Sequence, residues 1–136
     1  MTRTIRQSVL LAASPDELFD TYLDRRGHAA VTGGKVTVSA RPGSRFAAFG
    51  GMITGRTLEV LPKRLIVQSW RAGIWHDDDP DSTLVLAFSA GRRAGTGRID
   101  LIHIGVPGHD HDGVVKGWQS YYWRRWRAHL RAKNAP

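Results

Sequence analysis

The fold is decided by residues 113–132, which read GVVKGWQSYYWRRWRAHLRA. At the helical spacing of about 100° per residue, the large apolar side chains of this stretch fall on one broad stripe: Val115, Trp118, Tyr122, Trp126 and Leu130, with Trp123 at its edge. Arg124, Arg127 and Arg131 fall on the opposite side. We therefore predict a long C-terminal helix, capped by Asp112, whose aromatic stripe must be covered by a large curved surface.

The start of the chain predicts one strand followed by two short helices. Residues 5–13 are expected to form the strand. Ser14, Pro15 and Glu17 then mark a helix start, because serine caps the first turn, proline suits its first position and glutamate completes a capping box. The apolar residues that follow recur at helical spacing: Leu18, Phe19, Tyr22 and Leu23. A second helix is expected to be capped by Asp24 and to end near residues 32–34.

In the middle of the chain apolar and polar residues alternate with a period of two, which predicts an antiparallel meander with short turns. The expected strands cover residues 35–40, 45–49, 52–61, 64–72, 82–90 and 98–104. Alternation along three of these strands places one set of large side chains on a common inner face: Ile66, Gln68, Trp70, Leu84, Leu86, Phe88, Ile99, Leu101 and His103. Gln68 and His103 are then polar groups that point toward the helix.

Composition favours a single cytoplasmic domain that spans residues 1–136. The chain has no cysteine, which excludes disulfides and thiolate chemistry. It has no signal peptide and no apolar run of about 20 residues, so we expect no membrane insertion. The formal net charge is +8, but the arginines are scattered, so we expect no nucleic-acid binding. Only the row Arg124, Arg127 and Arg131 suggests a contact with an acidic chaperone segment or an anionic lipid.

Six short motifs resemble the activator of heat shock protein 90 ATPase family, in particular its C-terminal-domain type. They follow one another in the family's order: Ala30-Val-Thr-Gly-Gly34, Gly51-Met-Ile-Thr-Gly55, Leu61-Pro62, Leu65-Ile-Val-Gln-Ser-Trp-Arg71, His103-Ile-Gly-Val-Pro107 and Gly117-Trp-Gln-Ser-Tyr-Tyr-Trp123. The order of the elements is also similar to that of the helix-grip (START-like, Bet v 1-like) superfamily. The resemblance implies an α+β fold with a curved antiparallel sheet of about six to seven strands around a long C-terminal helix. It also implies an apolar or amphipathic ligand between sheet and helix.

Large side chains from both layers are the candidate lining of a ligand cavity: Phe19, Tyr22, Gln68, Trp70, Trp75, Phe88, His103, Trp118, Tyr122 and Trp126. The alternative is that these residues simply fill the core. Gln68 and His103 either orient the polar group of a ligand or satisfy each other and the backbone, because a buried polar group must be hydrogen-bonded. Trp75, beside an acidic loop at residues 76–81, is a candidate gate at the cavity mouth.

Other chemistry has weaker signals in this sequence. His103 has the residue type of a general base, but no nucleophile or carboxylate partner is identifiable. Residues 109–112 (His-Asp-His-Asp) offer metal-ligand types without a further ligand pair, and residues 76–81 lack the pattern of a calcium loop. We therefore expect no metal site, no cofactor and no catalytic residue.

The sequence thus predicts a non-enzymatic binding protein, monomeric or homodimeric, that holds a hydrophobic or amphipathic small molecule. A co-chaperone-like interaction module in a stress response is the first alternative. An enzyme that uses His103 is the second.

Overall fold

The computed structural model describes residues 1–135, and Pro136 lies outside the described part. Six strands form one antiparallel sheet in the order β1-β6-β5-β4-β3-β2. The strands are β1 (Thr2–Leu11), β2 (Arg45–Ala48), β3 (Ile53–Leu61), β4 (Leu65–Ala72), β5 (Ser82–Ala90) and β6 (Gly97–Pro107). Two short helices, α1 (Pro15–Leu23) and α2 (Arg25–Thr32), follow β1. A short turn, η1 (Phe49–Gly51), joins β2 to β3.

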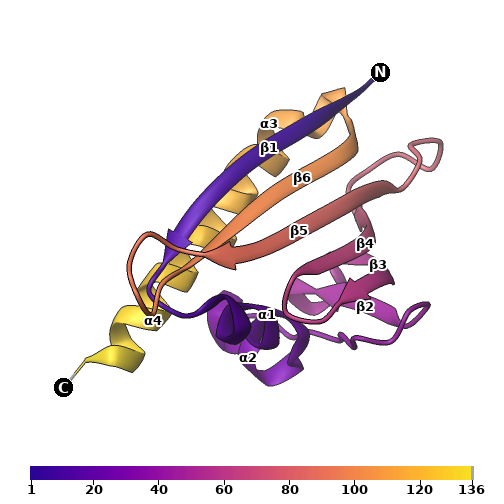
Figure 1. Cartoon of the computed structure of the whole chain (residues 1–136). Helices are drawn as coiled ribbons and strands as arrows, with labels where there is room; N and C mark the ends of the chain where they lie inside the picture. The colour runs from indigo at the N-terminus through magenta and orange to yellow at the C-terminus, as the bar shows by residue number, and fades with distance from the viewer. Residues whose placement is uncertain (136) are drawn as a thin grey trace.

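The C-terminal helix is built from consecutive segments that follow β6. They are the 3-10 turn η2 (Gly108–Asp110), α3 (His111–Gly117), the π-helical η3 (Trp118–Trp123) and α4 (Arg124–Asn134). Figure 1 shows this helix lying along one face of the bent sheet, behind β1 and β6, with α1 and α2 at the side of the sheet. The predicted α+β architecture, a curved antiparallel sheet around a long C-terminal helix, is confirmed, and the number of strands is six.

The helix starts predicted near the N-terminus are present. Ser14 Oγ accepts a hydrogen bond from the Glu17 amide at 3.2 Å, and Pro15 occupies the first turn of α1. Asp24 caps α2 by accepting from the Gly27 amide at 2.7 Å. The second helix ends at Gly33, whose φ of 81° is the left-handed conformation that glycine adopts at lowest cost. These side chains satisfy amide groups that a helix end leaves without partners.

The strand predicted at residues 35–40 is wrong. This segment makes a single antiparallel bridge, Thr37 with Ala47. On either side of this bridge its hydrogen bonds go to other elements: the Lys35 carbonyl accepts from the Gly50 amide of η1 at 3.1 Å, and the Ser39 carbonyl accepts from the Thr57 hydroxyl of β3 at 2.9 Å. A segment bonded in this way does not form a continuous ladder with β2.

The N-terminus of the final helix also differs from the prediction. The 3-10 turn η2 leads directly into α3, so the helix begins at His111 and Asp112 lies inside its first turn instead of capping it. Within η3 the π-helical turn rotates the side chains relative to a regular α-helix. Trp123, placed at the edge of the stripe by regular spacing, is therefore buried.

The core lies between the sheet and the C-terminal helix. Cross-strand register places Ile66 beside Leu86 and Leu86 beside Leu101, and all three are buried. The same inner face carries Gln68 and His103, both fully buried, as alternation along the strands predicted. From the helix the buried residues are Val114, Trp118, Tyr122, Trp123, Trp126 and Leu130.

Candidate functional site

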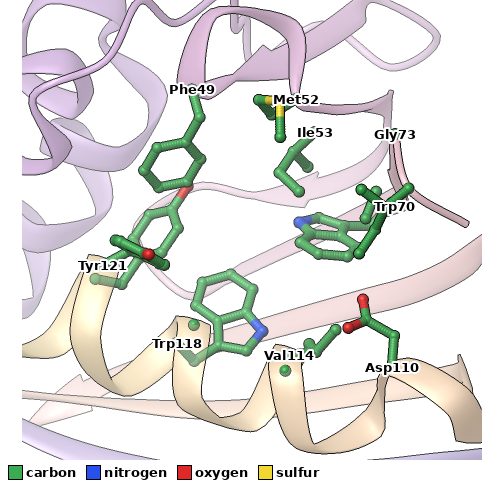
Figure 2. A pocket seen from close by; sticks show the side chains of 14 residues that line it. Phe49, Met52, Ile53, Trp70, Gly73, Asp110, Val114, Trp118 and Tyr121 are labelled. Carbon is green, nitrogen blue, oxygen red and sulfur yellow. The ribbon is translucent and has the colours of Figure 1, made fainter.

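A pocket of about 310 Å³ opens between the C-terminal helix and the ends of β3 and β4. Its walls are almost wholly apolar: Phe49, Met52, Ile53, Trp70, Ala72, Gly73 and Ile74 from the sheet side, and Asp110, Gly113, Val114, Gly117, Trp118, Tyr121 and Tyr122 from the helix side. Figure 2 shows side chains of both sides facing one another across this space. Met52, Ile74 and Tyr121 are 59%, 68% and 50% exposed, so they form the mouth of the pocket.

The pocket wall at η1 has an unusual backbone. Phe49 has a φ of 53°, which is uncommon for a residue with a side chain. This conformation directs its ring edge-on to Tyr122 and Tyr121, with centroid distances of 5.7 and 5.8 Å. Strained backbone of this kind persists only when its surroundings hold it in place, and it concentrates at functional sites. The aromatic wall that results crosses from the sheet side to the helix.

Two polar groups stand out in this apolar pocket. Trp70 is only 6% exposed, and its Nε1–H has no hydrogen-bond partner within residues 1–135. In Figure 2 this nitrogen lies on the side of the ring that faces Ile53 and Trp118. Trp126 Nε1 is also without a described partner, but it lies deep in the core and away from the pocket. At the opposite wall the Asp110 carboxylate accepts from Trp75 Nε1 at 2.8 Å.

The residues predicted to line a cavity divide into three groups. Trp70, Trp118 and Tyr122 line the pocket. Trp75 is buried behind it, with its ring 5.5 Å from that of Trp70, so it supports the wall instead of forming a gate. The others are packed in the core and absent from the lining: Phe19, Tyr22, Gln68, Phe88, His103 and Trp126. The physical reason is that sheet and helix pack tightly where these side chains lie, whereas the pocket opens near η1 and η2.

His103 is enclosed in a hydrogen-bonded chain behind the pocket wall and does not itself line the pocket. Its Nδ1 accepts from Trp118 Nε1 at 3.1 Å, so its Nε2 carries the proton and donates to Ser82 Oγ at 2.8 Å. The Ser82 hydroxyl in turn donates to the Trp70 carbonyl at 2.6 Å. Burial lowers the pKa of His103 to about 3, which keeps the imidazole neutral. Both ring nitrogens are occupied, so neither is free to act as a general base.

A second buried chain joins α1, α2 and the C-terminal helix. His28 Nδ1 donates to the Tyr22 carbonyl at 2.8 Å, and its Nε2 accepts from the Tyr122 hydroxyl at 2.7 Å. Burial lowers the pKa of His28 to about 4. The Tyr22 hydroxyl donates to Gln68 Oε1 at 2.7 Å. Gln68 and His103 therefore do not bond each other, and each is satisfied by different side chains.

Sequence reasoning missed several residues that line the pocket: Phe49, Met52, Ile53, Ile74, Asp110, Val114 and Tyr121. Most lie in turns, where no hydrophobic period exists to point them inward. One signal was available, since Met52 and Ile74 are large apolar residues beside glycines, at or just beyond the ends of predicted strands. The side chains of residues 109–112, which have metal-ligand types, do not converge on one site. His109 contacts Asp79, Asp110 contacts Trp75, and His111 contacts Asp112.

The arginines predicted to bind a partner line a separate groove. Arg124, Arg127 and Arg131 are exposed and border a hollow of about 620 Å³ between the C-terminal helix and β1. Val9 and Trp123 form part of its floor. None of the three arginines forms an ion pair within the described part of the chain. Since β1 is an edge strand, this positive groove runs beside a free strand edge.

A bent antiparallel sheet that encloses a C-terminal helix, with an apolar pocket between them, defines the chain as a helix-grip protein. Residues 12–131 match the family described as Activator of Hsp90 ATPase homolog 1-like protein, and the chain belongs to this family.

The chain is also similar to individual proteins and to solved structures. The chain is 26% identical to the human activator of 90 kDa heat shock protein ATPase homolog 1 over 119 residues, which cover 88% of this chain and 34% of the human protein. It is 27% identical over 123 residues to an uncharacterized protein from Schizosaccharomyces pombe, covering 90% of this chain and 36% of that protein. A solved HSP90 activator from Plasmodium falciparum has a similar fold, with a TM-score of 0.77 at 18% identity over 96% of this chain and 94% of that one. The chain spans about a third of the length of the curated relatives it matches.

No helix within residues 1–135 combines the length and the apolar character that crossing a membrane requires.

Proposed function

We propose that this protein binds a small apolar or amphipathic molecule in the pocket between η1, the end of β4 and the C-terminal helix. The observation that carries the proposal is the apolar pocket of about 310 Å³ between sheet and helix, with the unpartnered Trp70 Nε1–H buried in its wall. A buried donor without a partner costs about 1–3 kcal/mol, and a ligand acceptor that reaches this nitrogen through a small shift of the indole would recover that cost. The volume of about 310 Å³ is at the lower end of ligand clefts, which favours a compact ligand such as a two-ring aromatic carbonyl compound.

Gly117→Leu should abolish binding without unfolding the protein. A side chain at Gly117 would enter the pocket, and the nearest atom to its Cβ is Tyr121 Cδ2 at 3.8 Å, an ordinary contact. Replacing a helical glycine also favours the helix by up to about 1 kcal/mol. We expect the affinity for the fluorescent naphthalene ketone prodan to fall at least about tenfold, while the melting temperature is kept or raised. Fluorescence titration and thermal denaturation measure the two effects.

Ala128→Leu adds the same side chain to an exposed position of α4 and is the matched control. It should leave prodan binding unchanged. Trp70→Phe keeps an aromatic wall but removes the N–H, so it should weaken prodan, which has a carbonyl acceptor, more than unsubstituted naphthalene. Unaltered prodan affinity in Gly117→Leu, or an absence of saturable binding to the parent chain, would refute the pocket proposal.

A second candidate function is contact with an acidic segment of a heat shock protein 90 chaperone. The relatives named as activators of that chaperone support it, together with the groove lined by Arg124, Arg127 and Arg131. An extended acidic segment could pair with the free edge of β1 while its carboxylates meet the arginines. Guanidinium groups suit this role because they bind carboxylates in a bidentate manner.

The triple variant Arg124→Gln, Arg127→Gln, Arg131→Gln should lose most of any chaperone affinity. Calorimetry at low and moderate salt, with the chaperone from the same organism, measures the loss, and binding by the parent chain should weaken as salt rises. A charge-matched control replaces the exposed Arg41, Arg92 and Arg93 by glutamine. Equal losses of chaperone affinity in the two triple variants would show that only the net charge matters. This result would count against binding in the groove.

A further inference from the structure

Three side chains with metal-binding atoms converge at the loop that joins β4 to β5. His76 and Asp79 belong to this loop, and His109 comes from η2, a distant part of the sequence. His109 Nε2 lies 2.7 Å from Asp79 Oδ2, and His76 Nδ1 lies 3.9 Å from the same oxygen. One ligand atom of each residue lies within 4.8 Å of the other two. The two imidazole rings are stacked, with centroids 4.2 Å apart and planes inclined by 13°.

We propose that His76, Asp79 and His109 form a binding site for a divalent transition metal, of which Zn²⁺ is the best fit. Two imidazoles and one carboxylate suit zinc or nickel, whereas magnesium and calcium prefer sites made of oxygen atoms alone. Around a tetrahedral zinc ion, with bonds of about 2.0–2.2 Å, neighbouring ligand atoms lie about 3.3 Å apart. The separations from Asp79 Oδ2 to the two imidazoles, 2.7 and 3.9 Å, bracket this value. The two rings are stacked here, so these surface side chains would have to rotate apart for a nitrogen of each to point at the ion.

The β4–β5 loop that carries His76 and Asp79 is already ordered by hydrogen bonds. Arg71 of β4 donates to the backbone carbonyl of His76 at 2.5 Å and to that of Asp79 at 2.6 Å. It also pairs with the Asp81 carboxylate at 3.2 Å. The His76 amide donates to Asp79 Oδ2 at 2.8 Å, which closes the turn. A metal would therefore not have to order the loop when it binds, and less of its binding energy is lost to entropy.

Local charge also favours a cation at this loop. The protein has a formal net charge of +8, yet residues 77, 78, 79 and 81 are all aspartate. Both histidines are exposed and Asp79 is partly buried, so water has access to the remaining coordination position.

The position of the site gives the metal a structural role. It would cross-link the β4–β5 loop to η2 beside the rim of the pocket. In the same two segments Trp75 Nε1 donates to Asp110, and Asp110 and Ile74 line the pocket. A bound metal should therefore stabilise the rim, and the melting temperature should rise with zinc concentration as mass action requires.

Calorimetric titration of the untagged, chelator-treated full chain with zinc chloride at pH 7.5 tests the site. We expect one equivalent to bind, and His76→Ala or His109→Ala to weaken the affinity at least about tenfold. His111→Ala is the matched control, because His111 lies two residues from His109 and contacts Asp112 instead of the cluster. It should bind zinc within about twofold of the parent chain.

The experiment has clear contrary outcomes. A parent chain that binds zinc no better than His109→Ala, or an equal loss in His111→Ala, would overturn the site. Circular dichroism checks that the variants remain folded, and His76 and His109 lie on exposed positions where truncation is well tolerated. Asp79→Asn keeps an oxygen for the His76 amide while removing the charge, so it should weaken zinc binding without opening the turn. None of these measurements depends on whether the pocket binds prodan.

Discussion

Lowering the pH from 7 to 5 should raise the equilibrium constant for unfolding of this protein several hundredfold. Burial lowers the pKa of His28 to about 4 and that of His103 to about 3, so both remain neutral when folded. In the unfolded chain each titrates near its ordinary value of about 6.5. Between these values the unfolded state binds more protons, so stability falls as the pH falls, with a contribution of roughly 25-fold from each histidine between pH 7 and 5.

Urea denaturation at pH 7, 6, 5.5 and 5 measures this slope. His103→Gln should destabilise the protein at pH 7 but flatten the dependence, because one of the two titrating groups is removed. His129→Gln removes a partly exposed imidazole from α4 and is the control, which should keep the full slope. The start of the decline near pH 6.5 distinguishes histidine from carboxylates, whose ordinary pKa values lie near 4. Stability that is constant from pH 7 to 5 would contradict the neutral buried histidines.

Trp118→Ala should be among the most destabilising single substitutions, at about 3–5 kcal/mol. The indole is 2% exposed and contacts the rings of Trp70, Tyr122 and Trp123, with centroid distances of 6.3, 4.5 and 5.6 Å. Its Nε1–H is also the donor to His103 Nδ1. Truncation therefore leaves a cavity next to the pocket and removes the hydrogen-bond donor to His103 Nδ1. Both effects lower the free energy of unfolding.

Two variants separate these contributions in urea denaturation. Trp118→Phe retains most of the apolar volume but not the N–H, so it should cost about 1–3 kcal/mol. Tyr121→Ala, three residues along the same helix, truncates a ring that is 50% exposed and should cost about 1 kcal/mol or less. If Tyr121→Ala were as damaging as Trp118→Ala, the helix would not be oriented with Trp118 toward the sheet.

Regular patterns account for what could be predicted of the fold. The stripe Trp118, Tyr122 and Trp126 identified the buried face of the C-terminal helix, and all three are buried. The caps Ser14 and Asp24 located two helix starts, because capping depends on residues within one turn. The alternation of side chains along each strand likewise predicted which residues face the core, because it depends only on neighbouring residues.

The candidate site was predicted less well, because it lies where the periodic elements end. Trp70, Trp118 and Tyr122 were predicted to be in the cavity and line the pocket, whereas Phe49 and Asp110 were not foreseen. Phe49 and Asp110 belong to short turns, η1 and η2, whose direction depends on packing against other segments. The hydrogen-bond partners of His103 were equally inaccessible, since Ser82 and Trp118 approach it from another strand and from the helix.

The sequence by itself determined the α+β class, the inward aromatic face of the helix and the membership of a family, because each depends on local spacing or on motifs in order. Only the tertiary structure decided where sheet and helix part to leave a pocket, which polar groups are satisfied, and that His109 meets His76 and Asp79. These features depend on contacts between segments far apart in the chain. No pattern within one segment specifies the distance to another, so they emerge only when the sheet closes on the helix.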